Sequence, residues 1–344
     1  MANANQNPSL LALPKAELHV HLEGSIEPPT VVELAARHGG RLTAQEVAAR
    51  YAPGDFNQFI AAYLWVTSFL RDPADFALIM ERLGESLARQ NVLYAEITLS
   101  VGVMFRREQD PAANLEAIRV AARKIPSLRC AYILDCVRQW GAEPAMEVAR
   151  CAASLRNEGA VAFGMGGDEL SFPASDFRAA YDFARAAGLH SVVHAGETGD
   201  PQAIIDAISE LGAERIGHGI AAMRSDSLMD SLAQSGVCLE VCPTSNLRTG
   251  ALARQTGKPA PSEADHPLPM LLRRGVRVSL GADDPAMFET SLTAEYELAR
   301  RIGIAPAELT RLARAGFECA FLEPRSREEL LAAFESGRKA AGLV

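Results

Sequence analysis

The 344-residue chain lacks an apolar run long enough to cross a bilayer, and its first ten residues lack the basic start and apolar stretch of a signal peptide. Positive charge is also scarce: 34 Lys and Arg stand against 43 Asp and Glu, a net charge of −9. Because such a surface is poorly suited to neutralising phosphates, we expect neither a nucleic-acid polymer nor a membrane as partner. A small molecule is the expected partner, and the oligomeric state is left open.

Several common catalytic motifs are missing as well. The chain contains no G-x-x-x-x-G-K-[ST] phosphate loop and no G-x-S-x-G nucleophile turn, and the segment Gly164–Gly167 is too short for a dinucleotide fingerprint. His21-Leu22-Glu23 matches H-x-E, but the P-C-x-x-C partner of the cytidine-type zinc deaminases is absent, which excludes that deaminase fold.

The cysteines do not form a disulfide framework. Six are scattered along a chain without a predicted leader, which favours free thiols and a cytoplasmic location. Cys238 and Cys242 share one face of an expected strand, where core packing is the favoured role and a metal or disulfide role is the alternative.

The apolar content, 48% of the chain, is concentrated in short runs that end in turn residues. Such runs are typical of buried parallel strands, and segments with helical spacing separate them. The alternation predicts a TIM (β/α)8 barrel, formed by residues 1–344 as a single domain with residues 1–10 as a flexible tail. The expected strands are Ala16–Leu22, Val92–Ser100, Arg129–Val137, Ala160–Met165, Ser191–His194, Arg215–His218, Val237–Cys242 and Val276–Leu280. The expected helices are Pro111–Lys124, Pro144–Glu158, Ser175–Ala187, Pro201–Leu211 and Ser225–Gln234.

Two segments depart from the regular alternation. The stretch Glu27–Gln90 must hold extra helices between the first two strands, and these could form part of a lid. Thr249–His266 is rich in Pro, Gly and Ala and is expected to be a long loop.

Four histidines lie at or near predicted strand ends, where the catalytic groups of such barrels gather. His19 and His21 are two residues apart, so both point the same way from one strand and can bind one ion. His194 closes the fifth strand, and His218 lies between two glycines at the end of the sixth. A lone inward histidine would more often be an ordinary core residue, and His218 could equally serve a turn.

Two adjacent acids, Asp283 and Asp284, follow the eighth strand, which neighbours the first in a closed barrel. Three His and one Asp at one barrel mouth suit Zn²⁺ with a water in an open position, whose pKa the ion would lower toward ~7. Glu197, after a glycine turn, is placed to shuttle a proton. Taken singly, these acids could belong to solvated turns.

These segments resemble the adenosine deaminase family of metal-dependent hydrolases, across nearly the whole chain. The resemblance implies that His19, His21, His194 and Asp283 bind one zinc ion. It also implies that Glu197 protonates ring N1 of an adenine, His218 orients the water, Asp284 contacts N7 and Gly167 lies near N3. Hydroxide attack at C6 would then release ammonia.

The resemblance is stronger to the bacterial aminodeoxyfutalosine deaminases of menaquinone biosynthesis, which convert 6-amino-6-deoxyfutalosine to futalosine. Glu23 stands where adenosine deaminases usually have Asp near the sugar, and the Arg-x-x-Pro pattern after the second strand is missing. The substrate of that subgroup carries a benzoate, so we expect Arg138, or else Arg106 or Arg107, to pair with its carboxylate.

Three alternatives remain open. An adenosine or adenine deaminase of purine salvage would have the same site with a different sugar pocket. A hydrolase of another ring amide or ester would share the fold, because a fold does not fix a substrate. A non-catalytic metal-binding protein would be expected to have lost at least one of Glu197, His218 or Asp284, and the chain has all three.

Overall fold

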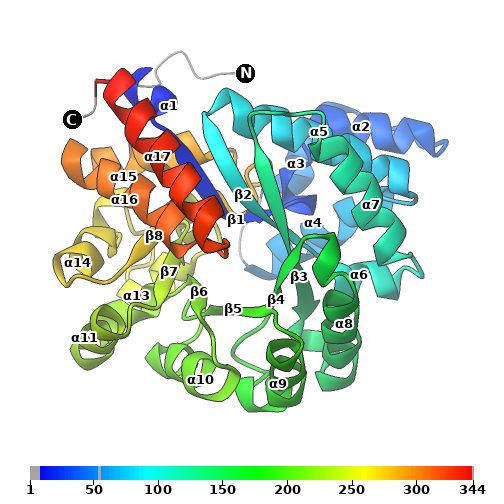
Figure 1. Ribbon diagram of the computed structural model, residues 1–344. Coiled ribbons are helices and arrows are strands. Elements are labelled where there is room, and N and C mark those ends of the chain that lie inside the picture. Colours follow the sequence, from blue (N-terminus) through cyan, green and yellow to red (C-terminus); the bar gives the residue numbers. More distant parts are fainter. Residues whose placement is uncertain (1–7, 53–55, 343–344) are drawn as a thin grey trace.

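Eight parallel strands follow one another around a barrel, and the helices surround them (Figure 1). The computed structural model describes residues 8–52 and 56–342. The predicted strands and the TIM-barrel fold are confirmed, with strand ends shifted by two residues at most. The strands are β1 (Lys15–His21), β2 (Val92–Leu99), β3 (Arg129–Val137), β4 (Ala160–Gly166), β5 (His190–Ala195), β6 (Arg215–His218), β7 (Cys238–Val241) and β8 (Val278–Leu280).

The last strand meets the first through the residue that follows it. The backbone N–H of Asp283 donates to the carbonyl of His19, and the N–H of His21 donates to the carbonyl of Asp283, each at 2.8 Å. Only a short stretch of β8 precedes this contact, so Asp283 itself completes the pairing around the barrel. The barrel is therefore nearly closed, and the acids after β8 lie beside the histidines of β1.

The five predicted helices are present, and three of them begin at a capping side chain. They are α7 (Pro111–Ala122), α8 (Ala142–Ser154), α9 (Arg178–Ala186), α10 (Pro201–Leu211) and α11 (Asp226–Ser235). Asp110, Asp200 and Ser225 each accept a backbone N–H at the first turn of α7, α10 and α11. Such caps satisfy donors that the helix itself leaves unpaired.

The predicted extra helices between β1 and β2 are also present. They are α2 (Pro28–Arg37), α3 (Ala44–Tyr51), α4 (Phe56–Val66) and α5 (Pro73–Arg89). Capping boxes at Thr43 and Asp72 start α3 and α5. Helix α4 has apolar residues around much of its circumference, which is typical of a helix that covers another surface of the protein.

Two expectations need correction. Part of the expected loop Thr249–His266 forms the helix α13 (Ala251–Thr256), because five residues that favour helix and one Thr stand between Gly250 and Gly257, both in left-handed conformation. Residues 1–7 of the expected flexible tail lie outside the described residues. Residues 8–10 begin the helix α1 (Pro8–Ala12), whose end is fixed by Lys15 Nζ donating to the carbonyls of Leu10 and Leu13.

The remaining helices follow β2, lie between β7 and β8, or follow β8. They are α6 (Val101–Arg106), α12 (Pro243–Arg248), α14 (Leu268–Arg273), α15 (Leu292–Arg301), α16 (Pro306–Cys319) and α17 (Pro324–Ala340). Helix α17 lies beside the start of β1, where Gly337 packs against Pro14 (Figure 1). Within residues 8–52 and 56–342, no helix has both the length and the apolarity to cross a membrane.

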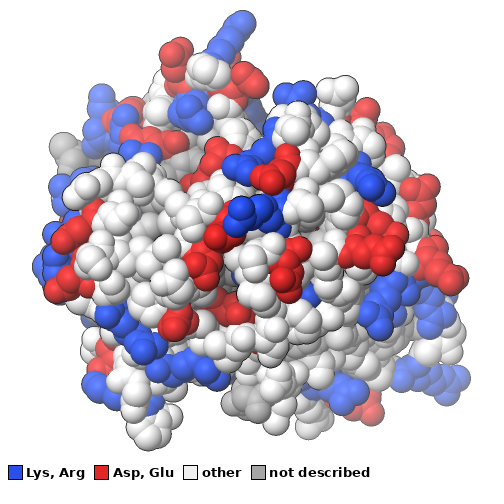
Figure 2. Space-filling model, turned by 90° about the horizontal axis from the view of Figure 1, so that it is seen from below, with Lys and Arg blue, Asp and Glu red and all other residues white. Residues whose placement is uncertain are grey.

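Charged side chains of both signs are interspersed on the face of the molecule shown in Figure 2. Exposed ion pairs such as Arg301 with Glu263, at 2.7 Å, recur along the helices. Pairs of this kind contribute little to stability because water screens both charges.

The barrel interior, in contrast, contains a buried network of charges. Arg215 on β6 lies 2.5 Å from a carboxylate oxygen of Glu96 on β2 and 2.5 Å from one of Glu240 on β7. All three side chains are almost completely shielded from solvent, and the ring of Phe321 covers the guanidinium at 3.8 Å. Burial alone would raise the pKa of Glu240, but Arg215 and then His19 lower it to about 2. Glu240 is therefore ionised inside the barrel.

Replacing Arg215 with Met should destabilise the protein strongly. The change leaves two buried carboxylates without their cation, which costs roughly 3–5 kcal/mol of unfolding free energy. Denaturant unfolding followed by circular dichroism measures it. The matched control is Arg314→Met, which removes a partly exposed arginine paired with Glu318 and Glu335 and should change stability by less than about 1 kcal/mol. Equal effects of the two variants would contradict the role given to the buried network.

Candidate active site

Four predicted ligands converge at the carboxyl end of the barrel. His19 and His21 come from β1, His194 from β5 and Asp283 from the residue that closes the barrel. Nε2 of His21 lies 3.3 Å from Nε2 of His194, and Oδ1 of Asp283 lies 3.4 Å from Nε2 of both His19 and His21. The ligand atoms of all four residues lie within 4.8 Å of one another.

The protonation of these groups suits a cation. Burial lowers the pKa of His21 and of His194 to about 3, so both rings are neutral and each offers a lone pair. Burial would also lower the pKa of His19, but Asp283 and Glu240 raise it well above its usual value. Nε2 of His19 is buried and has no hydrogen-bond partner among the described residues. A metal ion at this atom would replace the proton, so the four residues fit a metal site.

The outer nitrogens of two ligand rings are held by fixed acceptors. Nδ1 of His19 lies 2.7 Å from Glu240, and Nδ1 of His194 donates to the carbonyl of Met165 at 3.1 Å. These contacts set the tautomer and leave Nε2 of each ring for the ion. Glu240 also pairs with Arg215, so the buried network of the barrel interior supports a ligand directly.

Glu197 lies beside this cluster at the end of β5. Thr249 Oγ1 donates to its carboxylate at 3.2 Å, and Nε2 of His218 lies 3.6 Å away from it. Burial, reinforced by the negative charges of Asp283 and Glu169, raises the pKa of Glu197 to about 8. The carboxyl therefore carries a proton at neutral pH and can donate it.

Asp284 is a second buried carboxyl that keeps its proton. Burial and then the adjacent Asp283 raise its pKa well above the usual range. Its Oδ1 has no hydrogen-bond partner in the described part of the chain. A Cβ at position 24 would lie only 1.7 Å from this oxygen, so Gly24 leaves room for the acid. A buried, protonated carboxyl with an unused oxygen is suited to contacting a ligand nitrogen.

Two of the site residues have left-handed backbone conformations although neither is glycine. His218 has a φ of 62° and Asp283 a φ of 58°. Such conformations cost energy and persist where the surrounding structure fixes them, as the two hydrogen bonds to β1 do for Asp283.

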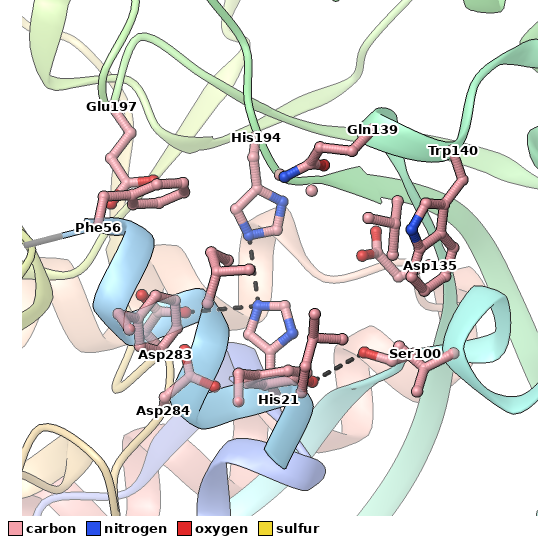
Figure 3. A pocket seen from close by; sticks show the side chains of 18 of the residues that line it. His21, Phe56, Ser100, Asp135, Gln139, Trp140, His194, Glu197, Asp283 and Asp284 are labelled. Carbon is pink, nitrogen blue, oxygen red and sulfur yellow. Dashed lines mark hydrogen bonds and ion pairs between the residues drawn. The ribbon is translucent and has the colours of Figure 1, made fainter. Parts of the chain in front are cut away.

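A cavity of about 220 Å³ is lined by the polar side chains of the site, namely His21, His194, Glu197, His218, Asp283 and Asp284 (Figure 3). Figure 3 shows Glu197 and Phe56 on one side of it and Gln139 and Trp140 on the other, with His21 and His194 between them. One helix, α4, contributes an apolar wall to the cavity, and the lid expected of Glu27–Gln90 stays a prediction. The apolar lining consists of Phe56, Phe59, Ile60, Leu64, Val103, Val137 and Trp140.

Gly167, expected near the ligand ring, does line the cavity. Its φ of 107° and the nearness of Gln139, whose Oε1 would lie 2.1 Å from an added Cβ, require glycine at this position. Its backbone is therefore accessible to a bound molecule.

Glu23 and Arg138, expected to contact a substrate, are not part of the lining. Glu23 accepts from the backbone N–H of Ser100 at 3.0 Å and from the hydroxyl of Tyr63 at 3.2 Å, so it anchors α4 to the barrel. Arg138 is buried and donates to the carbonyls of Phe172 and His194, at 3.1 and 2.8 Å. The guanidinium of Arg138 thus binds backbone carbonyls, and the sequence alone does not reveal these contacts.

Of the other two candidate arginines, Arg106 ends α6 and Arg107 follows it. Arg107 donates to the carbonyl of Leu64 and to Oγ1 of Thr67, which ties it to the end of α4. Arg106 is exposed, and its guanidinium lies 4.9 Å from the ring centre of Trp140, a residue of the cavity wall. Arg106 is therefore the candidate arginine whose guanidinium lies over an aromatic ring of the cavity wall.

Sequence reasoning missed several residues of the site. Glu240 and Asp135 are single acids within apolar strands, a signal that could have marked both as paired or functional. Burial raises the pKa of Asp135 to about 8, and this carboxyl lines the cavity. Trp140 and the aromatic residues of α4 carried no comparable signal, because aromatic residues at helical spacing are most often core.

A barrel with three histidines and an aspartate at the carboxyl ends of its strands defines the class of metal-dependent hydrolases. The adenosine deaminase family model matches residues 14–336, and the chain belongs to the adenosine deaminase family. It is a hydrolytic deaminase, as the resemblance of its motifs implied.

Three relatives illustrate the similarity. The chain is 40% identical over 324 residues to an aminodeoxyfutalosine deaminase of Streptomyces coelicolor, covering 91% of this chain and 81% of that protein. It is 35% identical over 323 residues to an adenine deaminase of Agrobacterium fabrum, covering 92% and 97%. The crystal structure of an adenine deaminase from Arthrobacter aurescens superposes with a TM-score of 0.86 at 28% identity, over 95% of this chain and 99% of that chain.

Replacing Glu240 with Gln should weaken metal binding about 10- to 100-fold, because the outer-shell acceptor of His19 loses its charge. Titration of the protein with Zn²⁺ against a competing chelator measures the affinity. The control is Glu295→Gln, an equally buried carboxylate that accepts from the backbone N–H of Thr244 and does not contact the four ligands. Affinity reduced equally by both changes would contradict a specific role for Glu240.

Proposed function

We propose that this protein is a zinc-dependent deaminase that converts 6-amino-6-deoxyfutalosine to futalosine and ammonia, as a step of menaquinone biosynthesis. One observation carries the proposal: four metal-ligand atoms cluster together, and three of these ligands line one cavity with a buried histidine and three carboxyls of raised pKa, while the opposite wall is apolar and aromatic. The relatives with 40% identity that bear the name of this activity support the choice of substrate.

One Zn²⁺ per chain is the ion best matched to the site. Three imidazole nitrogens and one carboxylate oxygen are a borderline set of ligands with a position left for water. When bound, the ion would supply Lewis acidity and lower the pKa of a water in that position.

The protein residues supply the remaining chemistry on the adenine ring. Glu197, protonated at neutral pH, donates its proton to ring N1, which makes C6 more electrophilic. Asp284, also protonated, donates to N7, and the backbone of Gly167 lies toward N3.

His218 orients the attacking water from the other side of the cluster. Asn246 Nδ2 donates to Nδ1 of His218 at 3.1 Å, so the proton of this neutral ring is on Nε2 and points to the cavity. The water oxygen forms a bond to C6 and one water proton goes to the amino group, which leaves as ammonia when the C6–N bond breaks. The other water proton returns to Glu197, and N1 keeps the proton that Glu197 gave.

The wall opposite the ion favours a nucleoside with an aromatic extension. Phe56, Phe59 and Trp140 offer aromatic faces, and Glu23, which occupies the sequence position near the sugar, is engaged with Ser100 and Tyr63. The benzoate extension of aminodeoxyfutalosine can pack on such a surface, whereas adenosine has no group to fill it. A deaminase of adenosine or adenine is the second candidate, which the 35% identity to an adenine deaminase supports.

The first experiment compares kcat/KM of the zinc-loaded protein on aminodeoxyfutalosine, adenosine, methylthioadenosine and adenine, followed by the absorbance change from adenine to hypoxanthine. Aminodeoxyfutalosine should be preferred by at least about tenfold, since the added ring and carboxylate supply contacts of more than ~1.4 kcal/mol. A preference for adenosine or adenine would instead assign the protein to purine salvage. Chelation should abolish activity, and Zn²⁺ should restore it.

Replacing Arg106 with Ala should lower kcat/KM about tenfold on aminodeoxyfutalosine and leave adenosine unchanged, because one charge-assisted contact to the carboxylate is lost. The guanidinium over Trp140 is the one placed to reach a carboxylate at the aromatic wall. Arg138→Ala serves as the comparison: it removes donors to the backbone of β5 and should lower the turnover of both substrates equally. A loss restricted to the carboxylated substrate in Arg138→Ala, and absent in Arg106→Ala, would reverse this assignment.

A further inference from the structure

The loop that carries Glu197, residues 196–200 after β5, is held by a carboxylate from another loop. Glu169, which follows β4, accepts the backbone N–H of Gly196 at 2.6 Å, of Thr198 at 2.5 Å and of Gly199 at 2.7 Å. The hydroxyl of Thr198 also donates to it, at 3.2 Å. Three backbone donors around Glu197 thus converge on a single side chain.

The carbonyl groups of the same loop are held from the opposite side. Gln255 on α13 donates its amide to the carbonyl of Glu197 at 2.9 Å and to that of Gly199 at 2.6 Å. Arg138 donates to the carbonyl of His194, just before the loop. Three backbone donors and two backbone acceptors of the loop are therefore bound by two side chains, Glu169 after β4 and Gln255 on α13.

The loop sequence is adapted to this carboxylate. Gly196 has a φ of 68°, which turns its N–H toward Glu169. A Cβ on Gly199 would lie 2.7 Å from Oε2 of Glu169, so a side chain there would collide with the acceptor. The two glycines that flank Glu197 and Thr198 thus permit the close approach of backbone and carboxylate.

We propose that Glu169 is a positioning residue that fixes the backbone of Glu197 and so aims the Glu197 carboxyl at the substrate ring. This role rests on the proposed function of Glu197 as proton donor. Glu169 is not part of the cavity lining, so it acts on the site from outside, through the loop that it holds and through its charge, which helps to raise the pKa of Glu197.

A charge is needed for this task. Convergent backbone N–H groups form an anion-binding concavity, and hydrogen bonds to an ionised acceptor are about twice as strong as neutral ones. Glutamine at position 169 would keep one oxygen, but its amide group would face N–H donors. The loop would loosen, and a misplacement of the acid by ~1 Å lowers turnover about 100-fold.

The test is a double-mutant cycle between positions 169 and 197. Glu169→Gln should lower kcat about 10- to 100-fold with KM changed by less than about threefold, because ring binding persists while proton donation is misaligned. In the Glu197→Gln background the same change should lower kcat by less than about threefold, since two residues that act as a unit are not additive. Equal losses in both backgrounds would overturn the proposal in favour of a general structural role.

The matched control is Asp200→Asn on the same loop, which weakens the cap of α10 at the N–H of Gln202 without touching the N–H groups that Glu169 holds. It should leave kcat within about threefold of the unchanged enzyme. Zinc content and thermal melting show whether each variant is folded, and Glu169→Asp, which keeps the charge, provides a second variant that should retain more activity than Glu169→Gln.

Hydrogen exchange separates this inference from the substrate proposal. Glu169→Gln should speed exchange at the amides of Gly196, Thr198 and Gly199 by at least about tenfold, whatever the substrate, because their hydrogen bonds to a charged acceptor are lost. Unchanged exchange at these amides would overturn the positioning role even if every deamination result agreed with the proposed function.

Discussion

The carboxylate of Glu240 is shared between Arg215 and His19, and the placement of the site depends on this shared charge. Arg215 alone would be a buried cation, and His19 alone would be a ring free to turn. With Glu240 between them, at 2.5 Å from one and 2.7 Å from the other, each fixes the position of the next. The buried charges of the barrel interior therefore fix the orientation of a metal ligand, because Arg215 on β6 holds Glu240 on β7 and Glu240 holds His19 on β1.

The closure of the barrel acts on the same ligands from the other end of the chain. Asp283 is both the residue that completes the pairing to β1 and the acid that faces His19 and His21. A ligand set drawn from positions more than 260 residues apart is thus assembled by two backbone hydrogen bonds. The same turn positions the adjacent Asp284, and burial together with the charge of Asp283 raises its pKa and keeps it protonated.

Much of this arrangement could be predicted from the sequence because it depends on local patterns. Buried strands are continuous apolar runs, and ligands at strand ends follow from barrel topology, so His19, His21, His194 and Asp283 could be placed together. The destination of a long side chain depends instead on packing between distant segments. The sequence therefore singled out Arg138 but could not show that it donates to two backbone carbonyls. The helix Ala251–Thr256 was missed because the glycines on either side of it are typical of a loop.

The cavity has two origins in the chain, and this separation has an evolutionary consequence. Its metal and proton-transfer groups stand on strand ends that the barrel itself fixes, whereas its apolar wall comes largely from α4, within the insertion between β1 and β2. Arg107 and Glu23 fasten that helix without involving a metal ligand. Substitutions on the inner face of α4 can therefore accumulate and retune which nucleosides are accepted, while the chemistry at C6 is inherited unchanged.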